Sequence, residues 1–500
     1  MASYAIPEPA EFAGEWWLPA DGEHAHKVAG TLVWGEERAA LSLHDAFTPT
    51  RGTIYGNEER RYAAVHGTTT KSELVTILQA SSGGGGFAIG QAGLREAERL
   101  VSSWVVVGAH VTEETRYSEL RLRVPGLEVW VSRGGVTMSL IHKTPEKPAT
   151  VLYAVEGMSE EITPVPSAAL ALAWGIDREF SGNLVSDIGV TTSAALRITA
   201  EEPQTLEWFI MQFGKAMTLT SFIAGAPMGA DYLTAKLPDG RSVDVLVALR
   251  ASKRCTHKDQ GKFFMCRSGM QADLGDVFAR WYDRYETIAS PSQLALSVFS
   301  SEGLWLHVEF LSLMQALEGF HRATMDGRYM DDAEYKAVAG TLAQSIPTHV
   351  GPDHREALKA RLKWGNEVSL RKRLDALVER LDLSLRQRLL GRNGTFPRSW
   401  IHTRNYYTHW DDEAREDAMD GREMYVACAR MRLLLRALYL NLVGIPQESI
   451  AKALDGACKE SQYLVQLNTA EYRKANPGSK AGRMMTVHVG EAEPPTPSTP

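Results

Sequence analysis

A short stretch near the C-terminus brings together an arginine and a histidine, two residue types that can act on a phosphate group. It reads Arg404-Asn405-Tyr406-Tyr407-Thr408-His409. Arginine keeps its charge and presents a planar fork of N–H donors to phosphate oxygens, whereas histidine both accepts and donates a proton near neutral pH. The two suffice, in principle, to cleave RNA without a metal ion, because RNA supplies its own nucleophile, the 2′-hydroxyl. The alternative is a surface arginine with a capping or core histidine, since this spacing also arises by chance.

The spacing constrains where this Arg404–His409 stretch can lie. On an ideal α-helix, residues five apart lie about 140° apart around the axis. The two side chains would therefore not share a face in the middle of a helix, but they can converge at a helix end or where a loop enters a helix. Two glycines and Pro397 just upstream favour such a break. The acidic residues after Trp410 predict a first helical turn, where carboxylates suit the positive end of the helix dipole.

Length and charge indicate a large protein with a locally basic region. The chain has 500 residues, a hydrophobic content of 44% and a net charge of −7, which favours two to four domains and excludes a uniformly basic nucleic-acid coat. Residues 355–404, however, hold thirteen Lys and Arg against five Asp and Glu, and residues 411–423 hold seven acids against two arginines. This pattern fits a site that receives a polyanion from one side. An equally strong alternative is a solvated helix face with i,i+4 ion pairs such as Glu367 with Arg371.

The cysteines and the hydrophobic runs indicate a protein of the reducing cytoplasm. Four cysteines are too few and too scattered for a disulfide framework. Cys255, His257 and Cys266 lack both a C-x2-C pair and a clear fourth ligand, so we predict no zinc and no cofactor. The chain opens without the features of a secretory signal, and its longest apolar run, 433–443, is interrupted by polar residues. We therefore expect a cytoplasmic protein that does not associate with membranes.

Alternating apolar and polar residues predict short β-strands through the first third of the chain. We expect strands at 27–34, 39–43, 104–107, 120–124, 127–131, 136–141 and 149–155. Pro125 and Gly126 predict a hairpin turn between 120–124 and 127–131. The glycine run 83–86 is predicted to be a flexible hairpin loop, because no Lys-Ser/Thr pair follows it as a phosphate-binding loop requires. Many short strands at close spacing favour an antiparallel sandwich or barrel.

The rest of the chain turns from mixed to almost wholly helical. Strands are expected at 195–199 and 243–249, and helices at 205–222 and at 274–289, the second ended by Pro291. Further helices are expected at 304–322, 335–346, 355–362, 368–390, 422–443 and 447–472, which predicts a helical bundle. We expect an α+β protein with a β-rich domain at 1–180, a mixed α/β extension at 181–295, a helical bundle at 296–475 and a disordered tail at 476–500.

The helical half resembles a HEPN domain in three features. The first is the Arg404–His409 stretch, which has the family's R-x4–6-H form with a polar residue after the arginine. The second is the early helical segment 310–322, and the third is the long helical segment 423–444 after the motif. The N-terminal half is similar to the ApeA type that precedes such domains in bacterial anti-phage proteins. Its likeness rests on Glu15-Trp-Trp-Leu-Pro19, on Gly30-Thr-Leu and on Pro125-Gly-Leu-Glu-Val-Trp130.

The resemblance implies a metal-independent endoribonuclease that acts in abortive infection, as a homodimer or a higher homo-oligomer formed through its HEPN domains. RNA, with transfer RNA as one candidate, would be the substrate, and a phage component would be the trigger. Cleavage by the 2′-hydroxyl would leave a 2′,3′-cyclic phosphate, with His409 as general acid or base and Arg404 holding the phosphate. Asn405 would orient the histidine or bind a phosphate oxygen, or else cap a helix.

Four further side chains are candidate contacts for the substrate. Tyr406 and Tyr407 could stack on bases or pack in the core, and Glu318 and His321 of the early helical segment could line the cleft or be structurally paired. The competing hypothesis is a catalytically silent sensor or scaffold that binds a phage component through its β-rich half. A carbohydrate-acting β-sandwich is disfavoured, because residues 1–180 contain no convincing pair of carboxylates.

Overall fold

We describe the fold from a computed structural model of the whole chain, which divides into two compact units, Met1–Glu286 and Thr287–Pro500. The structure describes residues 4–20, 26–35, 38–47, 60–90, 93–131, 136–141, 150–155, 160–183, 187–248, 255–257, 259–301, 303–410 and 415–475. The predicted tail 476–500 lies outside these residues. A β-rich N-terminal part followed by a helical C-terminal part is observed, so the predicted fold class is confirmed.

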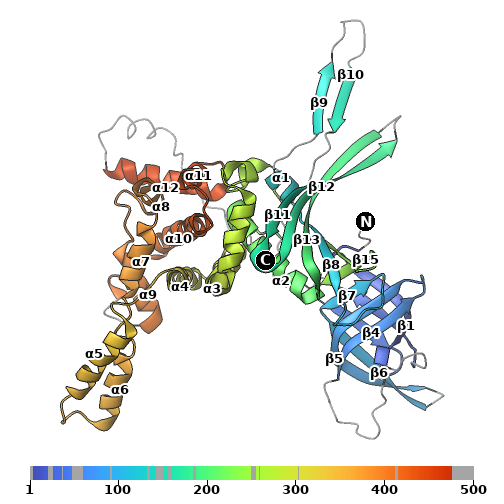
Figure 1. Cartoon of the computed structure of the whole chain (residues 1–500), viewed down its shortest axis with the longest axis horizontal. Coiled ribbons are helices and arrows are strands. Elements are labelled where there is room, and N and C mark those ends of the chain that lie inside the picture. The colour runs from blue at the N-terminus through green and yellow to red at the C-terminus, as the bar shows by residue number, and fades with distance from the viewer. Residues whose placement is uncertain are drawn as a thin grey trace, which may run out of the picture. The chain divides into compact units, whose positions relative to one another are not determined.

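A closed barrel of six antiparallel strands forms the start of the first unit (Figure 1). Its strands, in the order in which they pair, are β5 (Leu74–Gly90), β4 (Arg61–Thr69), β1 (Ala10–Trp17), β2 (Val28–Trp34), β3 (Ala39–Leu43) and β6 (Gly93–Ser102). Pairing between β5 and β6 closes the ring. Burial alternates along β2, as a strand with one face in a core requires, and the rings of Trp16 and Trp34 are fully enclosed.

An open antiparallel sheet continues from the barrel because β5 belongs to both. Residues 75–78 of β5 pair with β7 (Trp104–Val107), whereas residues 81–90 pair with β6 on the same edge. Gln79, between the two stretches, has a φ of 52°, a left-handed backbone conformation that redirects the strand. Beyond β7 the sheet adds β15 (Ser242–Val247), β14 (Tyr232–Lys236), β8 (Tyr117–Arg123), β13 (Asp187–Gln204), β12 (Leu170–Asn183) and β11 (Glu161–Val165). A separate hairpin pairs β9 (Val136–Ile141) with β10 (Thr150–Val155).

The predicted strand at 127–131 is wrong, because this segment is the short helix α1 (Leu127–Val131). Both edges of β8 are already occupied, by β13 on one side and β14 on the other, so the chain after it has no edge to pair with. Gly126 turns the backbone with a φ of 84°. The following helical turn buries Trp130, whose indole N–H donates to the Met265 carbonyl at 3.0 Å.

The predicted loop at 83–86 is also wrong, because β5 runs through these glycines to Gly90. The register between β5 and β6 shifts between Ser82 and Gly85, which marks a β-bulge. Glycine inside a strand weakens the strand and is typical of such bulges. The glycine run therefore indicated an irregularity within the strand, but it did not mark the end of the strand.

Two long helices complete the first unit and lead into the second. The helix α2 (Leu206–Ala224) is capped by Thr205, whose side chain accepts from the Trp208 N–H at 3.3 Å, and it packs against β13. The helix α3 (Leu274–Ser300) does not end before Pro291 as predicted but continues through it. Pro291 is buried, and Gly319 leaves it room, since a Cβ on that glycine would lie 3.1 Å from the proline ring. This packing offsets the roughly 3 kcal/mol that an internal proline costs a helix.

The second unit is a helical bundle, as predicted, but its helices are more broken than the sequence indicates. Its helices are α4 (Leu306–Thr324), α5 (Asp332–Gln344), α6 (Pro352–Leu362), α7 (Leu370–Glu379), α8 (Leu383–Leu390), α9 (Arg398–His409), α10 (Gly421–Leu442), α11 (Gln447–Leu454) and α12 (Lys459–Ala475). The predicted single helix 368–390 is two helices, because Asp382 accepts from the Leu385 N–H at 2.8 Å and starts a new one. The predicted helix 447–472 is likewise split into α11 and α12.

The core of this bundle is built by α4 against α10, and α5 and α6 form a hairpin at its end (Figure 1). Phe320 of α4 meets Tyr439 of α10 edge-to-face, with ring centroids 4.8 Å apart. α10 begins with a capping box in which Asp420 and Glu423 bond each other's backbone N–H groups. Neither α5 nor α6 buries a residue. No helix among the described residues is long and apolar enough to pass through a lipid bilayer.

Two glycine-to-alanine changes, one in the barrel and one on α2, are expected to change the free energy of unfolding in opposite directions. In Gly14→Ala the new Cβ would lie 2.2 Å from the Thr68 carbonyl oxygen of the neighbouring strand, so we expect a loss of about 1–3 kcal/mol. The matched change Gly214→Ala on α2 meets nothing within 4 Å and should stabilise the protein by about 0.5–1 kcal/mol. Denaturant unfolding of both variants checks this, and a neutral Gly14→Ala would contradict the strand packing described here.

Candidate functional site

Helix α9 carries the whole Arg404–His409 stretch, and two buried residues fix its position. Trp400 packs edge-to-face on Phe396 with ring centroids 5.0 Å apart, and the Thr403 hydroxyl accepts the Met419 N–H at 2.9 Å. The helix stops at Trp410, whose φ of 53° is left-handed and whose N–H returns to the Tyr406 carbonyl at 2.7 Å. His409 is therefore the last helical residue, and the predicted position at a helix end agrees with the structure.

Two details of that prediction need correction. No helix was predicted for the residues that lead into the motif, yet α9 begins at Arg398 and runs through the motif. The predicted helical turn after Trp410 falls partly on residues 411–414, which lie outside the described residues. The next α-helix, α10, begins only at Gly421, and of the acidic group Asp420 serves as its N-cap.

Arg404 lies half-exposed on the side of α9 that faces α4. Its Nη2 is 4.0 Å from the Glu318 Oε2, and its Nη1 donates to the Asn405 Oδ1 at 3.4 Å. The side chain of Arg404 keeps 30% of its surface exposed. A separation of 4.0 Å gives attraction without a close hydrogen bond, so the guanidinium is oriented but not fully occupied. A phosphate could therefore bind it without breaking a strong pair.

Glu318 is the end of a chain of alternating charges that runs through the bundle. Its Oε1 accepts from Arg322 at 3.1 Å, and Arg322 also bonds the Glu367 carboxylate at 2.7 Å. The Glu367 Oε2 accepts from Arg373 as well, at 2.9 Å, and Arg373 is almost fully buried. The hydrogen bond from Arg322, more than any other contact, holds the pKa of Glu367 below its usual range. This Arg–Glu chain ties α4 to the start of α7 and places the carboxylate that faces Arg404.

His321 lies at the buried end of this Arg–Glu chain, and only 1% of its surface is exposed. Its Nδ1 is 3.3 Å from the Arg373 Nη1. A guanidinium can only donate, so Nδ1 is the acceptor and the ring is neutral with its proton on Nε2. Burial, and then the charge of Arg373, lower the pKa of His321. The geometry therefore gives His321 a structural partner and does not present it to a substrate.

The outward face of α9 carries His409 together with Asn405. Both side chains are exposed, and four residues separate them, so they lie one turn apart on the same face. Asn405 sits in the helix interior and caps no helix, which removes one of its predicted alternatives. Its bond to the Arg404 guanidinium leaves it between the two candidate catalytic groups, where its amide can meet a phosphate oxygen.

Aromatic rings surround the end of α9. Tyr407 stacks on His307 of α4 with ring centroids 5.7 Å apart and an interplanar angle of 14°. Tyr406 packs edge-on against Tyr407 and against Trp410, at 5.0 Å and 5.9 Å between centroids. Trp410 keeps 67% of its surface exposed. Tyr406 and Tyr407 are each partly exposed, so both pack within this aromatic cluster and still reach solvent.

Four residues were not predicted from the sequence to belong to the site, namely His307, Arg322, Glu367 and Arg373. The spacing of four between Glu318 and Arg322 was an available signal, because such pairs meet on one helix face. The other contacts cross between helices and leave no local mark in the sequence. The predicted pair of Glu367 with Arg371 is wrong, since Glu367 bonds Arg322 and Arg373 instead. In the part of the chain that the structure describes, no group of His, Cys, Asp and Glu is arranged to hold a metal ion.

The buried His321 predicts a pH dependence of stability. Its pKa is lower in the folded protein than in the unfolded chain, so below about pH 6.5 the unfolded chain takes up a proton that the folded one resists. We therefore expect the helical unit to lose stability as the pH falls below about 6.5 and to keep it above that value. Calorimetry should find this slope reduced in His321→Gln and unchanged in His349→Gln, which alters an exposed histidine. An unaltered slope in His321→Gln would contradict the neutral, buried ring.

Comparison with known families covers both units. The family model of Apea-like HEPN matches residues 311–449, which include most of α4 and all of α9 and α10. The family model of ApeA N-terminal domain 1 matches residues 11–281, more than half of the chain. No curated protein and no solved structure gives a significant match. The chain belongs to the family of ApeA-like HEPN proteins, and this membership supports a role as an anti-phage HEPN effector.

Proposed function

We propose that this protein is a metal-independent endoribonuclease in which Arg404 and His409 act on one phosphodiester of RNA. The observation that carries the proposal is the end of α9. There the Arg404 guanidinium is half-exposed, the His409 imidazole is exposed, and Asn405 lies between the two in the sequence. The 2′-hydroxyl attacks the adjacent phosphorus, the bond to the 5′-oxygen breaks, and the products are a 2′,3′-cyclic phosphate and a 5′-hydroxyl. Membership in the HEPN family supports a nuclease of this kind.

Arg404 is suited to the phosphate because of the way Glu318 holds it. The carboxylate at 4.0 Å orients the guanidinium toward α4, while 30% of the side chain remains accessible. Charge that builds up on the phosphorane oxygens is then met by a fixed cation that needs little reorganisation. Glu318 itself is drawn toward Arg322, at 3.1 Å, so its charge is shared and competes less with an incoming phosphate.

His409 takes the role of general acid or base because it is exposed at the C-terminal end of α9. Histidine exchanges protons near neutral pH, and a positioned acid or base contributes roughly 10²–10⁴-fold to a rate. On one helix, however, His409 and Arg404 diverge by about 140°. A homodimer that faces two copies of α9 resolves this divergence, because Arg404 of one protomer then meets the phosphate with His409 of the other. Dimerisation through the HEPN unit is accordingly part of the proposal.

The β-rich unit takes the part of the sensor in this proposal. Anti-phage effectors that cut RNA must be silent before infection, and the ApeA N-terminal domain occupies the larger share of the chain. A phage component bound there is the trigger, and RNA, with transfer RNA as one candidate, is the substrate. Sequencing the RNA ends produced during induced expression identifies the target and the end chemistry together.

Replacing either catalytic group should abolish cleavage while leaving the fold intact. Arg404→Ala removes the cation at the phosphate, and His409→Ala removes the acid or base, so each should lower the rate by about 10²-fold or more. Cleavage by the wild type should persist in EDTA. Lys336→Ala and His349→Ala alter an exposed lysine and an exposed histidine elsewhere in the unit and serve as controls.

The same variants separate the enzyme from a catalytically silent scaffold. Growth arrest on overproduction should disappear in His409→Ala if RNA cleavage causes it. Arrest that survives in both Arg404→Ala and His409→Ala would favour the scaffold, and cleavage that strictly requires Mg²⁺ would refute the mechanism.

The exposed aromatic rings predict a contribution to RNA affinity. Tyr406 packs on Tyr407 and Trp410 in a cluster that reaches solvent at the end of α9, so Tyr406→Ala should weaken binding of single-stranded RNA by about 1–3 kcal/mol through the loss of one stacked base. Tyr425→Ala is the matched control, because Tyr425 is 58% exposed on α10 and packs on Tyr463 instead. Equal losses in both variants, measured by fluorescence anisotropy, would argue against base stacking at α9.

A further inference from the structure

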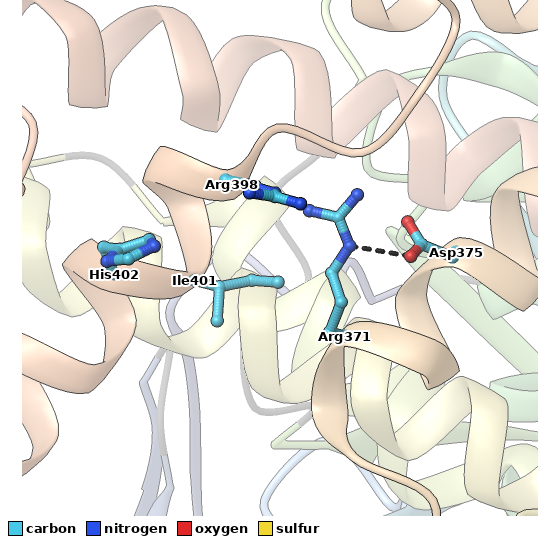
Figure 2. Close-up of a pocket in the computed structure, with 5 residues that line it drawn as sticks. All are labelled: Arg371, Asp375, Arg398, Ile401 and His402. Carbon is cyan, nitrogen blue, oxygen red and sulfur yellow. Dashed lines mark hydrogen bonds and ion pairs between the residues drawn. The ribbon is translucent and has the colours of Figure 1, made fainter.

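An open cavity of about 480 Å³ lies between α7 and α9, next to the motif but outside it. It is lined by Arg371 and Asp375 of α7 and by Arg398, Ile401 and His402 of α9. Figure 2 shows the side chain of Arg398 pointing toward the guanidinium of Arg371, with His402 lying beyond Ile401 on the side away from Asp375. Two cations therefore converge on one opening.

The charges in this cavity are not balanced by the protein. Asp375 accepts from the Arg371 Nε at 2.7 Å and is the one carboxylate in the lining. The Nη1 of Arg371 is shielded from solvent and has no hydrogen-bond partner among the described residues. A cationic N–H that is cut off from water and unpaired is costly, and a second guanidinium pointing at it adds repulsion. An anion in the cavity would screen the two charges.

Nearby acidic groups do not fill this position. Asp417 lies 3.5 Å from the Nδ1 of His402, at the other end of the lining, and its side chain is 71% exposed. With His402 neutral, the lining residues sum to one positive charge. The planar fork of a guanidinium group matches phosphate oxygens through two parallel hydrogen bonds, as it does carboxylate oxygens.

The cavity also lies on the same face of α9 as the candidate catalytic histidine. Arg398, His402, Asn405 and His409 follow each other at intervals of four, three and four, so they lie within about 60° around the helix axis. All four are exposed, which agrees with one outward face. His402 and His409 are about 10 Å apart along the axis at 1.5 Å per residue. A single strand laid along this face would reach His409 and the cavity together.

We propose that this cavity is a second phosphate subsite, in which Arg371 and Arg398 hold a phosphodiester of the same RNA strand that His409 helps to cleave. This inference rests on the proposed function, because it names how the substrate of that site is aligned. Neither arginine contacts the scissile phosphate. Both arginines position the RNA strand along α9. Full binding therefore requires an RNA long enough to reach the cavity and His409 together.

The test measures RNA binding by the full chain carrying His409→Ala, so that the RNA is not cut. A fluorescent single-stranded RNA of mixed sequence is titrated between about 50 and 200 mM salt, where each phosphate contact adds about 0.7 to the slope of log K against log salt. Arg398→Ala or Arg371→Ala should lower this slope by about 0.7 and weaken binding by roughly tenfold. Lys336→Ala on α5 removes an exposed charge away from the cavity and should leave the slope unchanged.

The outcomes separate this inference from the proposed function. If cleavage depends on Arg404 and His409, but Arg371→Ala and Arg398→Ala keep both the cleavage rate and the salt slope, the subsite is overturned and the nuclease is left intact. If the salt slope falls in Arg371→Ala and Arg398→Ala, but the protein with His409 intact never cuts RNA, the result supports the subsite and overturns the nuclease. If Arg398→Ala loses the binding of inorganic phosphate but keeps the RNA salt slope, the cavity binds a free anion and the RNA subsite is overturned. If the protein binds no RNA, both proposals are overturned.

Discussion

The geometry of the candidate site depends on one chain of alternating charges that begins in the core and ends at the surface. Arg373 is buried, and its charge is compensated by Glu367 at 2.9 Å. Arg322 and Glu318 continue the chain to Arg404. A buried cation must be paired, because an unpaired one costs several kcal/mol. The need to neutralise Arg373 therefore fixes the position of the Glu367 carboxylate. Each later side chain of the Arg–Glu chain is then positioned by the one before it.

The last contact in this chain, between Glu318 and Arg404, is the loosest one, and its looseness is useful. The buried pair is close and shielded, whereas the last separation, between Glu318 and Arg404, is 4.0 Å with part of the arginine in water. Exposed pairs contribute little to stability, about 0–1 kcal/mol, and are readily replaced by a better partner. The chain thus combines a rigid base with an arginine that a phosphate can recruit. The same reasoning explains why His321 is a structural residue, since its Nδ1 accepts from Arg373 at the rigid end.

The sequence was a good guide where chemistry or periodicity is local. The Arg404–His409 stretch was singled out by residue type and spacing, and most helices and about half of the strands were predicted from helical or alternating patterns. It failed where a partner distant in the chain decides the outcome. Residues 127–131 alternate like a strand, but β13 and β14 already fill both edges of β8. Helix α9 has little apolar periodicity and is held by Met419, sixteen residues from Thr403. The burial of His321 depends on Arg373, which lies 52 residues further along the chain.

Part of the basic stretch before the motif is used in internal pairing. Arg373 and Arg388 bond carboxylates of the bundle, and Lys359 pairs with Glu356 on its own helix. The interpretation of this stretch as a solvated face of paired charges is therefore right in part, because only some of its cations have a carboxylate partner among the described residues. The polyanion track stays a prediction. Near the motif, Arg398 and Arg371 meet at the cavity, where Asp375 pairs with Arg371, and Arg404 lies further along α9. The net charge of +8 over residues 355–404 therefore overstates how much positive charge is open to a polyanion, because part of it is paired within the bundle.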